Sequence, residues 1–324
     1  MREPTRIAIH TQNLTRSFGD VRAVDDLCLE TERGKVFGFL GPNGAGKTTT
    51  IRLLLGLLAP SSGSAQVLGY DLATQADEIR RRTGVLLEHT GLYERLSAQD
   101  NLDLYGRIWH MPTADRAARI RELFTHLDLW DRRGEQVGKW SRGMKQKLAV
   151  ARTLLHHPAL IFLDEPTAGL DPIAAVALRQ DLAGLARQEG VAIFLTTHNL
   201  AEAEELCHRV GVINQGRLLA LGTPDQLRAQ RDQPRLTVIG RGFTQAVVDL
   251  LCERAEVAAA RLSREPGPAQ SLIVELTGKV DTAPIVSLLV ESGVEVEEIR
   301  KDRASLADVF MQLVSGEPSD APAP

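Results

Sequence analysis

The sequence has few cysteines and no long apolar run. Its three cysteines, Cys28, Cys207 and Cys252, lie far apart and in no paired-ligand spacing, which argues against a disulfide framework and a zinc site. No segment approaches the roughly 18 apolar residues that a membrane-crossing helix needs, and the N-terminus lacks the apolar core of a signal peptide. We therefore expect a protein of the reducing cytosol, whose contact with a membrane would come through a partner.

An excess of positive charge is also missing. The 38 lysines and arginines are outnumbered by 42 aspartates and glutamates, which gives a net charge of -4. Without an overall basic field, counterion release cannot drive sequence-independent binding to nucleic acid, and we expect no nucleic-acid partner. The apolar fraction of 43% is that of an ordinary globular protein, and 324 residues are enough for two domains.

The residue pattern predicts a larger α/β domain followed by a smaller α+β domain. Over residues 1–222, apolar runs of strand length alternate with helical stretches, which predicts a parallel sheet covered by helices; residues from about 89 to 157 are mostly helical in pattern. A polar segment with glycine and proline predicts a linker over residues 223–234. Residues 235–314 follow the order βαββαβ, which predicts a ferredoxin-like domain, and the composition of residues 315–324 predicts a disordered tail.

A glycine-rich loop stands between a predicted buried strand, residues 35–40, and a predicted helix, residues 49–58. The pattern is that of a phosphate-binding loop. The residues expected to contact a nucleotide are Gly41, Pro42, Asn43, Gly44, Ala45, Gly46, Lys47, Thr48 and Thr49. The glycines let backbone N–H groups turn toward phosphates, Lys47 is expected to reach the β- and γ-phosphates, and the Thr48 hydroxyl is expected to ligate Mg²⁺. The loop predicts binding of a nucleoside triphosphate.

A second apolar run, residues 160–163, ends in two acids, Asp164 and Glu165. Asp164 is expected to hold the Mg²⁺ shell, and Glu165 to orient or deprotonate the attacking water. A strand that ends in two acids is also common as a solvated turn. We favour the catalytic interpretation because the run follows the glycine-rich loop by over a hundred residues, as the strand beside it in a parallel sheet would.

A helix start with a capping residue lies between these two motifs. Ser141 is predicted to cap a helix that runs to about His157. Such a start offers free N–H groups, an oriented dipole and a hydroxyl, which together can contact the γ-phosphate of a second nucleotide. The pattern alone is equally that of an ordinary capped amphipathic helix.

In this order, the motifs resemble those of the ABC transporter ATPase family over about residues 5–222. The resemblance implies an ABC cassette, with a RecA-like core and antiparallel β and helical subdomains, that binds ATP and Mg²⁺ and works as an ATP-sandwich dimer with a second copy of itself. The family signature usually reads Leu-Ser-Gly-Gly-Gln, and here Trp140, Arg142 and Met144 replace its first, third and fifth residues. Ser141 and Gly143, the two positions that the family places against the γ-phosphate of the opposite subunit, are retained.

Four further residues take their roles from the same resemblance. Asp171 matches the D-loop, which communicates between the two sites. His198 matches the switch histidine, which would contact the γ-phosphate, and Phe18 lies where the family stacks an aromatic ring on adenine. Glu88 stands where many members have a glutamine, and it is expected to face Mg²⁺ or the attacking water.

Residues 90–102 are similar to those of drug-resistance-type exporter ATPases, including the group named for daunorubicin resistance. This similarity implies a subunit that hydrolyses ATP to energise an exporter, at the cytoplasmic face of the membrane and bound to a separate integral-membrane permease. We expect Leu92, Tyr93 and Leu96 to line the groove for a cytoplasmic helix of that permease.

Two other functions compete with the exporter. A soluble ABC ATPase of DNA repair or translation is disfavoured, because the chain carries neither a second cassette nor a large insertion. A regulatory ATPase without transport, whose domain at residues 235–314 senses a ligand, remains open, since such a domain resembles small-molecule sensors as much as dimer braces. The transported substrate is not encoded in this chain.

Overall fold

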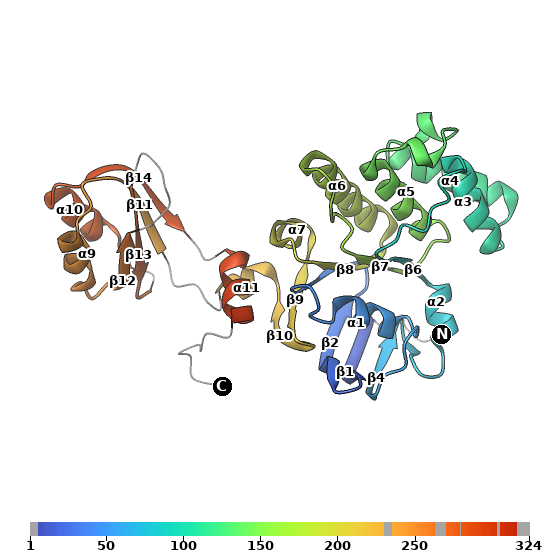
Figure 1. Ribbon diagram of the computed structural model, residues 1–324, viewed down its shortest axis with the longest axis horizontal. Helices are drawn as coiled ribbons and strands as arrows, with labels where there is room; N and C mark the ends of the chain where they lie inside the picture. The colour runs from blue at the N-terminus through green and yellow to red at the C-terminus, as the bar shows by residue number, and fades with distance from the viewer. Residues whose placement is uncertain (1–5, 230–234, 263–269, 279, 303–304, 316–324) are drawn as a thin grey trace. The chain divides into compact units, whose positions relative to one another are not determined.

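The computed structural model describes residues 6–229, 235–262, 270–278, 280–302 and 305–315 (Figure 1). They fall into two units, Met1–Pro224 and Asp225–Pro324, which are described separately. Among the residues described, no helix combines the length and the apolar character needed to cross a bilayer.

The centre of the first unit is a six-stranded sheet of order β10-β9-β3-β8-β7-β6. Its strands are β3 (Val36–Leu40), β6 (Thr83–Leu86), β7 (Leu160–Asp164), β8 (Ala192–Thr197), β9 (Arg209–Asn214) and β10 (Arg217–Gly222). All neighbouring strands from β6 to β9 are parallel, and β10 is antiparallel to β9. The predicted parallel sheet is confirmed. The expectation that the strand of Asp164 lies beside the strand of the glycine-rich loop is wrong, because β8 pairs with both and separates them.

A second, antiparallel sheet of order β2-β1-β4-β5 faces the first. It contains β1 (Ile7–Phe18), β2 (Val21–Glu32), β4 (Ser62–Val67) and β5 (Tyr70–Asp71). Helix α1 (Lys47–Leu54) lies between the two sheets (Figure 1). Fully buried side chains from both sheets and from α1 form one core, including Ile9, Leu27, Phe39, Ile51, Leu54, Phe162 and Phe194. This core fixes α1, and therefore the loop before it, against the main sheet.

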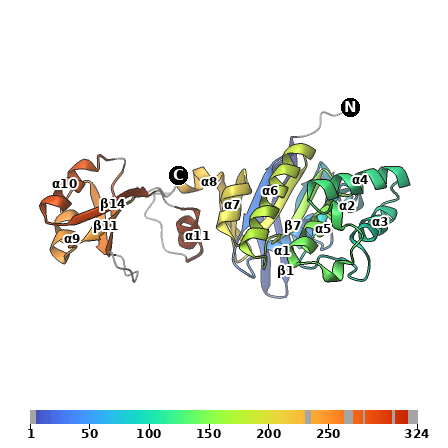
Figure 2. The same cartoon turned by 90° about the horizontal axis from the view of Figure 1, so that it is seen from above.

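The other helices of the first unit lie on the opposite face of the six-stranded sheet, except α2, which lies beside β5 and β6 (Figure 1). They are α2 (Ala76–Arg81), α3 (Ala98–Ile108), α4 (Thr113–His126), α5 (Arg142–Leu154), α6 (Pro172–Glu189) and α7 (Leu200–Leu206). Figures 1 and 2 show α5 and α6 side by side over the sheet, with α3 and α4 beyond α5. The predicted helical stretch of residues 89–157 therefore contains α3, α4 and α5, together with short 3-10 turns at Trp130–Arg132 and Val137–Lys139.

The second unit is built around an antiparallel sheet of order β12-β13-β11-β14. In chain order its elements are α8 (Pro224–Ala229), β11 (Arg235–Arg241), α9 (Gln245–Cys252), β12 (Val257–Leu262), β13 (Gln270–Leu276), α10 (Ala283–Glu291), β14 (Glu295–Asp302) and α11 (Leu306–Ser315). Apolar residues of the sheet, α9 and α10 form its core, among them Leu236, Leu251, Val274 and Leu289. Between β11 and β14 the order is therefore βαββαβ, with every strand pair antiparallel.

Two predicted segments lie partly outside the residues that the structure describes. Helix α8 falls within the linker predicted for residues 223–234, and residues 230–234 lie outside the described part of the chain. Residues 316–324 of the predicted tail also lie outside it.

Phe194 is the central ring of the aromatic cluster that joins the strands of the main sheet. Its ring centroid lies 5.3 Å from that of Phe37, 5.5 Å from Phe39 and 5.6 Å from Phe162, and Phe194 is fully buried. We expect Phe194→Ala to lower the free energy of unfolding of the first unit by about 3–5 kcal/mol, because it leaves a cavity that the packed rings cannot fill.

Urea denaturation followed by tryptophan fluorescence measures this change, since the three tryptophans all lie in the first unit. Ile173→Ala is the matched control: Ile173 is 83% exposed, and a change within about 0.5 kcal/mol is expected there. An equally small effect of Phe194→Ala would show that the cluster does not stabilise the sheet.

Candidate functional site

The glycine-rich loop follows β3 and leads into α1 along a path that requires glycine. Gly44 and Gly46 have left-handed φ angles of 80° and 107°. A Cβ atom on Gly46 would lie 2.2 Å from the carbonyl oxygen of Ala23, and one on Gly41 would lie 2.4 Å from that of Ile213. The first turn of α1 has no acidic residue, so its free N–H groups favour an anion.

Lys47 is a buried cation held by the same loop. Its ammonium group donates to the carbonyl oxygens of Gly41, at 2.8 Å, and Pro42, at 3.1 Å. It also lies 3.2 Å from Oε1 of Glu165, while only 6% of its side chain is exposed. A charge this deeply buried needs an anionic partner, and phosphates entering the loop would compete with Glu165 for it.

Asp164, at the end of β7, accepts hydrogen bonds from two threonines. The Thr48 hydroxyl donates to Oδ2 at 2.7 Å, and the Thr196 hydroxyl donates to Oδ1. Thr48 comes from α1 and Thr196 from β8, so the carboxylate connects three elements of the core. A carboxylate next to a hydroxyl is the oxygen donor set that suits Mg²⁺, which takes its remaining ligands from phosphates and water.

Glu165 follows immediately and has a left-handed backbone, with φ of 50°. Its N–H donates to the carbonyl oxygen of Thr196 at 3.0 Å, which fixes this conformation. Nδ1 of His198 lies 3.0 Å from Oε2 of Glu165, so the carboxylate stands between an imidazole and the Lys47 ammonium. A quarter of the Glu165 side chain is exposed, which leaves the carboxylate accessible to water. This geometry suits a general base or a group that orients a water molecule.

These groups surround one cavity of about 570 Å³. The predicted site residues in its wall are Asn43, Gly44, Gly46, Lys47, Thr48, Thr49, Glu88, Asp164 and Glu165. Gly41, Pro42 and Ala45 belong to the loop but do not line the cavity. His198 lines a neighbouring cavity of about 420 Å³, and Glu165 contributes to both.

Four predicted residues lie away from the cavity walls. Ser141 and Asp171 cap α5 and α6, accepting from the N–H groups of Met144 and Ala174, respectively. Gly143, in the first turn of α5, does not line the cavity, and neither does Phe18. Phe18 is 47% exposed, with the guanidinium of Arg16 4.6 Å from its ring centroid. Within this one chain, the structure does not bring these residues to the glycine-rich loop.

Three residues of the site were missed by the sequence analysis. Arg142 and Gln146 line the cavity, and Gln146 donates to the carbonyl oxygen of Pro166 at 2.7 Å. Their i, i+4 spacing on α5 was the available signal, because it places both on one face of the helix. The contact of Thr196 with Asp164 depends on the pairing of β7 with β8, which the sequence does not specify.

The three residues predicted to line a permease groove do not line the apolar groove of this structure. An apolar groove of about 310 Å³ exists, but its wall includes Leu57, Tyr105, Ile108 and Trp109 and none of Leu92, Tyr93 and Leu96. Tyr93 lies next to it, with its ring centroid 6.4 Å from that of Tyr105. Residues far apart in sequence, from the turn after α1 and the end of α3, meet at this surface, and the docking role of Leu92, Tyr93 and Leu96 stays a prediction.

Glu202, on α7, is a buried carboxyl group close to the site. Its side chain has no exposed surface. Burial raises its pKa; the hydroxyl groups of Thr197 and Thr167 and the charge of Arg179 oppose this rise only in part, and the negative charge of Glu165 adds to it. Burial therefore shifts the Glu202 carboxyl group toward its neutral form, close enough to Glu165 for the two carboxyl groups to interact.

Comparison with known proteins identifies similar chains. Residues 24–168 match the family model described as ABC transporter. The chain is 36% identical over 308 residues to the daunorubicin resistance ATP-binding protein DrrA3 of Streptomyces coeruleorubidus, covering 94% of this chain and 95% of that protein. It is 35% identical over 308 residues to the bacitracin transport ATP-binding protein BcrA of Bacillus licheniformis, covering 95% and 97%. A solved ATP-binding subunit of an ABC transporter superposes with a TM-score of 0.62 at 32% identity, covering 69% of this chain and 93% of that one.

The buried state of Glu202 gives the protein a distinctive pH dependence. A carboxyl group with a raised pKa keeps its proton in the folded state longer than in the unfolded chain, so its contribution to stability is complete below the ordinary pKa of about 4.5 and is lost as the pH rises through the folded value. We expect Glu202→Gln to match the wild type near pH 4 and to become progressively more stable than it at higher pH, by about 1.4 kcal/mol for each unit of the rise in pKa.

Urea denaturation of both proteins between pH 4 and pH 8 measures this difference. Glu30→Gln, which removes a 52% exposed carboxylate, is the control and should show no such trend. A stability difference that stays constant over this pH range would contradict a raised pKa of Glu202.

Proposed function

Because this chain belongs to the ATP-binding subunits of ABC transporters, we propose that it is the subunit that energises an exporter. Members of this family bind and hydrolyse ATP, and both activities follow from that membership. The observation that carries the site assignment is the cavity in which Lys47, Asp164 and Glu165 converge on one glycine-rich loop. The exporter assignment is supported by full-length similarity to proteins named for daunorubicin resistance and bacitracin transport.

In this proposal the loop and Lys47 bind the phosphates of ATP. The backbone N–H groups at the start of α1 and the Lys47 ammonium supply the positive potential. Thr48 and Asp164 hold Mg²⁺, with Glu88 on the same cavity wall as a further oxygen donor. Mg²⁺, when bound, neutralises negative charge on the phosphates.

Glu165 and His198 form the hydrolytic pair. In the structure, the Glu165 carboxylate is shared between Lys47 and His198. Phosphates that engage Lys47 leave Glu165 held by His198 alone, which frees one carboxylate oxygen to accept a proton from water. The imidazole thus orients the base, and it lies within reach of the phosphate end of the site.

A second copy of the chain completes each site. Ser141 is exposed at the start of α5, whose first turn carries no acidic residue, and Asp171 is exposed at the start of α6. Both helix starts offer N–H groups that this chain's own cavity does not use. The proposal is that Ser141 and Gly143 contact the nucleotide of the partner copy, that Asp171 communicates between the two sites, and that Phe18 stacks on adenine.

The permease docks in the apolar groove beside α3. Leu57 and Ile108 are 52% and 58% exposed there, and Trp109 is 37% exposed, which is unusual for large apolar side chains gathered in one depression. An amphipathic cytoplasmic helix of an integral-membrane protein fits such a groove through its apolar face. This contact would hold the chain at the cytoplasmic face of the membrane.

Removing the base should separate ATP binding from hydrolysis. We expect Glu165→Gln to lower the hydrolysis rate by about 10²–10⁴-fold, because the amide cannot accept a proton, while ATP affinity is retained. Single-turnover hydrolysis measures the rate, and size-exclusion chromatography with ATP should show an accumulated dimer. Glu30→Gln, at an exposed position, should behave like the wild type. Near-normal turnover of Glu165→Gln would remove Glu165 from this role.

Charging the groove should release the chain from the membrane. We expect Ile108→Asp to move most of the protein from the membrane fraction to the soluble fraction, because a buried carboxylate would oppose the docked apolar helix. Affinity purification from membranes, with identification of the polypeptide that co-purifies, measures the loss. Leu219→Asp, at a 39% exposed position on β10, is the control and should retain the partner. An unchanged yield of the partner with Ile108→Asp would exclude this groove as the docking site.

A further inference from the structure

A second cavity, of about 620 Å³, opens at the other edge of the six-stranded sheet. Arg82 and Ala159, in its wall, directly precede β6 and β7, whereas the nucleotide cavity lies where β3 and β7 end. Parallel strands place these ends on opposite edges of a sheet. This basic cavity is therefore separate from the nucleotide site, and none of the motifs discussed above accounts for it.

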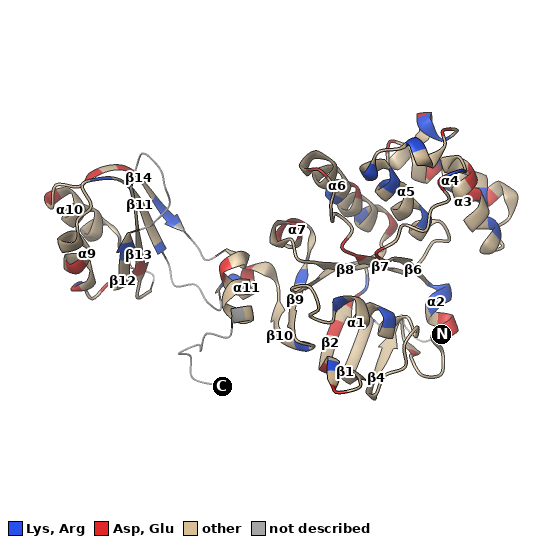
Figure 3. Cartoon of the chain, in the orientation of Figure 1, with Lys and Arg blue, Asp and Glu red and all other residues tan. Residues whose placement is uncertain are grey.

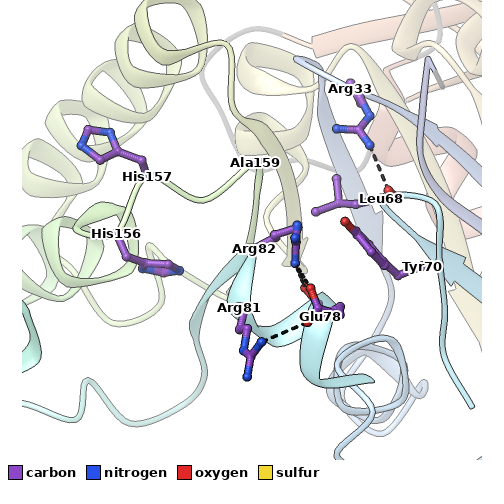
Figure 4. Close-up of a pocket in the computed structure, with 9 residues that line it drawn as sticks. All are labelled: Arg33, Leu68, Tyr70, Glu78, Arg81, Arg82, His156, His157 and Ala159. Carbon is purple, nitrogen blue, oxygen red and sulfur yellow. Dashed lines mark hydrogen bonds and ion pairs between the residues drawn. The ribbon is translucent and has the colours of Figure 1, made fainter. Parts of the chain in front are cut away.

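Three arginines from two segments of the chain border the basic cavity, against one glutamate (Figure 4). Arg33 lies in the turn between β2 and β3, Arg81 ends α2, and Arg82 caps it. Figure 3 shows both basic and acidic residues on α2; the acidic residue that borders the cavity is Glu78. The surplus of positive charge is local, because the whole chain is net negative.

Glu78 acts as an internal counterion to two of the arginines. One of its oxygens lies 3.0 Å from Nη1 of Arg81, and the other accepts from Nη1 of Arg82. Arg82 is further held by a bond to the Glu78 carbonyl oxygen at 3.1 Å and by the ring of Tyr70, 4.6 Å from its guanidinium carbon. A planar guanidinium fixed in this way is ordered before a ligand arrives and loses little entropy on binding.

His156, one of two histidines in the wall of the cavity, adds no charge to it at neutral pH. His156 lies 3.2 Å from the Thr83 carbonyl oxygen through Nε2, and its ring stacks on Trp109 with centroids 3.9 Å apart. Burial lowers the pKa of His156 to about 4, so Nε2 donates to this oxygen and Nδ1 is a buried acceptor. The positive potential of the cavity thus comes from its arginines, and it persists at neutral pH.

This arrangement suits a compact anion with several oxygens. Guanidinium groups bind phosphate oxygens through paired N–H donors, and their charge does not depend on pH in the physiological range. A single acidic side chain already engages two of the arginines, which shows that an oxygen anion can reach both at once. A phosphate, with more oxygens and more charge than a carboxylate, would contact Arg33 from the opposite wall as well.

We propose that the basic cavity binds a phosphate group, carried by a soluble phosphate ester or by an anionic lipid headgroup. His156 lines both this cavity and the apolar groove, so the two sites share a wall. If the groove receives the permease, as in the proposed function, a lipid headgroup beside that permease is within reach. Phosphate binding itself does not depend on the proposed function.

The test uses the full chain with saturating Mg-ADP, which keeps the nucleotide cavity occupied. Titration with glycerol 3-phosphate is followed through the imidazole NMR signals of His156 and His157, which both line the basic cavity. We expect saturable shifts that weaken with salt. Arg33→Gln and Arg82→Gln should each lower the affinity about tenfold, the loss of one charge-assisted hydrogen bond. Arg187→Gln, which removes an exposed arginine of α6, is the charge-matched control and should leave the affinity unchanged.

Glu78→Gln distinguishes a binding site from a purely structural ion cluster. Removal of the internal counterion should raise the affinity for glycerol 3-phosphate several-fold, although it breaks two ion pairs. A structural cluster would lose stability on this change without a gain in affinity. Thermal unfolding of each variant identifies any that fail to fold, and Arg81→Gln, at a 69% exposed position, is a milder substitute for Arg82→Gln.

Vesicles separate the two sources of phosphate. Binding to phosphatidylglycerol vesicles, but not to phosphatidylcholine vesicles, that is lost in Arg33→Gln and kept in Arg187→Gln would assign the site to a lipid headgroup. Binding of glycerol 3-phosphate alone would assign it to a soluble ester. The proposal is overturned if neither ligand binds, or if Arg33→Gln and Arg82→Gln bind as the Arg187→Gln control does.

Discussion

The site depends on one buried carboxylate with two hydroxyl partners. Asp164 ends β7 and accepts from Thr48 of α1 and Thr196 of β8, so a single side chain sets the distance between the helix that follows the glycine-rich loop and two strands of the main sheet. Because little of Asp164 is exposed, leaving either oxygen unpaired would be costly. The same hydrogen bonds hold Thr48 and Asp164 in the positions from which, in the proposed function, they bind Mg²⁺. Asp164 therefore both stabilises the fold and contributes to the proposed metal site.

The sequence predicted the parts of this site that are encoded locally. The pattern from Gly41 to Thr48 requires a particular backbone path, and the structure shows why: Gly44 and Gly46 have left-handed φ angles, and Gly41 has no room for a Cβ atom. Apolar runs likewise predicted β3 and β7, in which every residue is buried. Each of these signals is contained within about ten residues, where hydrophobic pattern and glycine chemistry are reliable guides.

Features that depend on which distant segments meet were not predictable. The sequence placed the strand of Asp164 beside β3, whereas β8 lies between them, and strand order is set by the packing of the whole sheet. The apolar groove forms where the turn after α1 meets the end of α3, and no local pattern in the sequence indicated it. No sequence pattern indicated that Glu202 is buried, because its burial follows from the way α7 packs. From sequence alone, a glutamate in a polar helical stretch is expected to be exposed to solvent.

The position of β8 at the centre of the sheet has a consequence for folding accuracy. This strand supports Asp164 through Thr196 and leads directly to His198, the partner of Glu165. Successive side chains of a strand point to opposite faces, so a slip of one residue that placed Leu195 opposite Asp164 would remove the Thr196 hydroxyl and shift the imidazole by a full strand position. A chain with that slip could still bury its apolar residues, since every residue of β8 is buried, yet it would lose both contacts together. The two polar contacts therefore select a single register in a strand whose hydrophobicity alone would tolerate several.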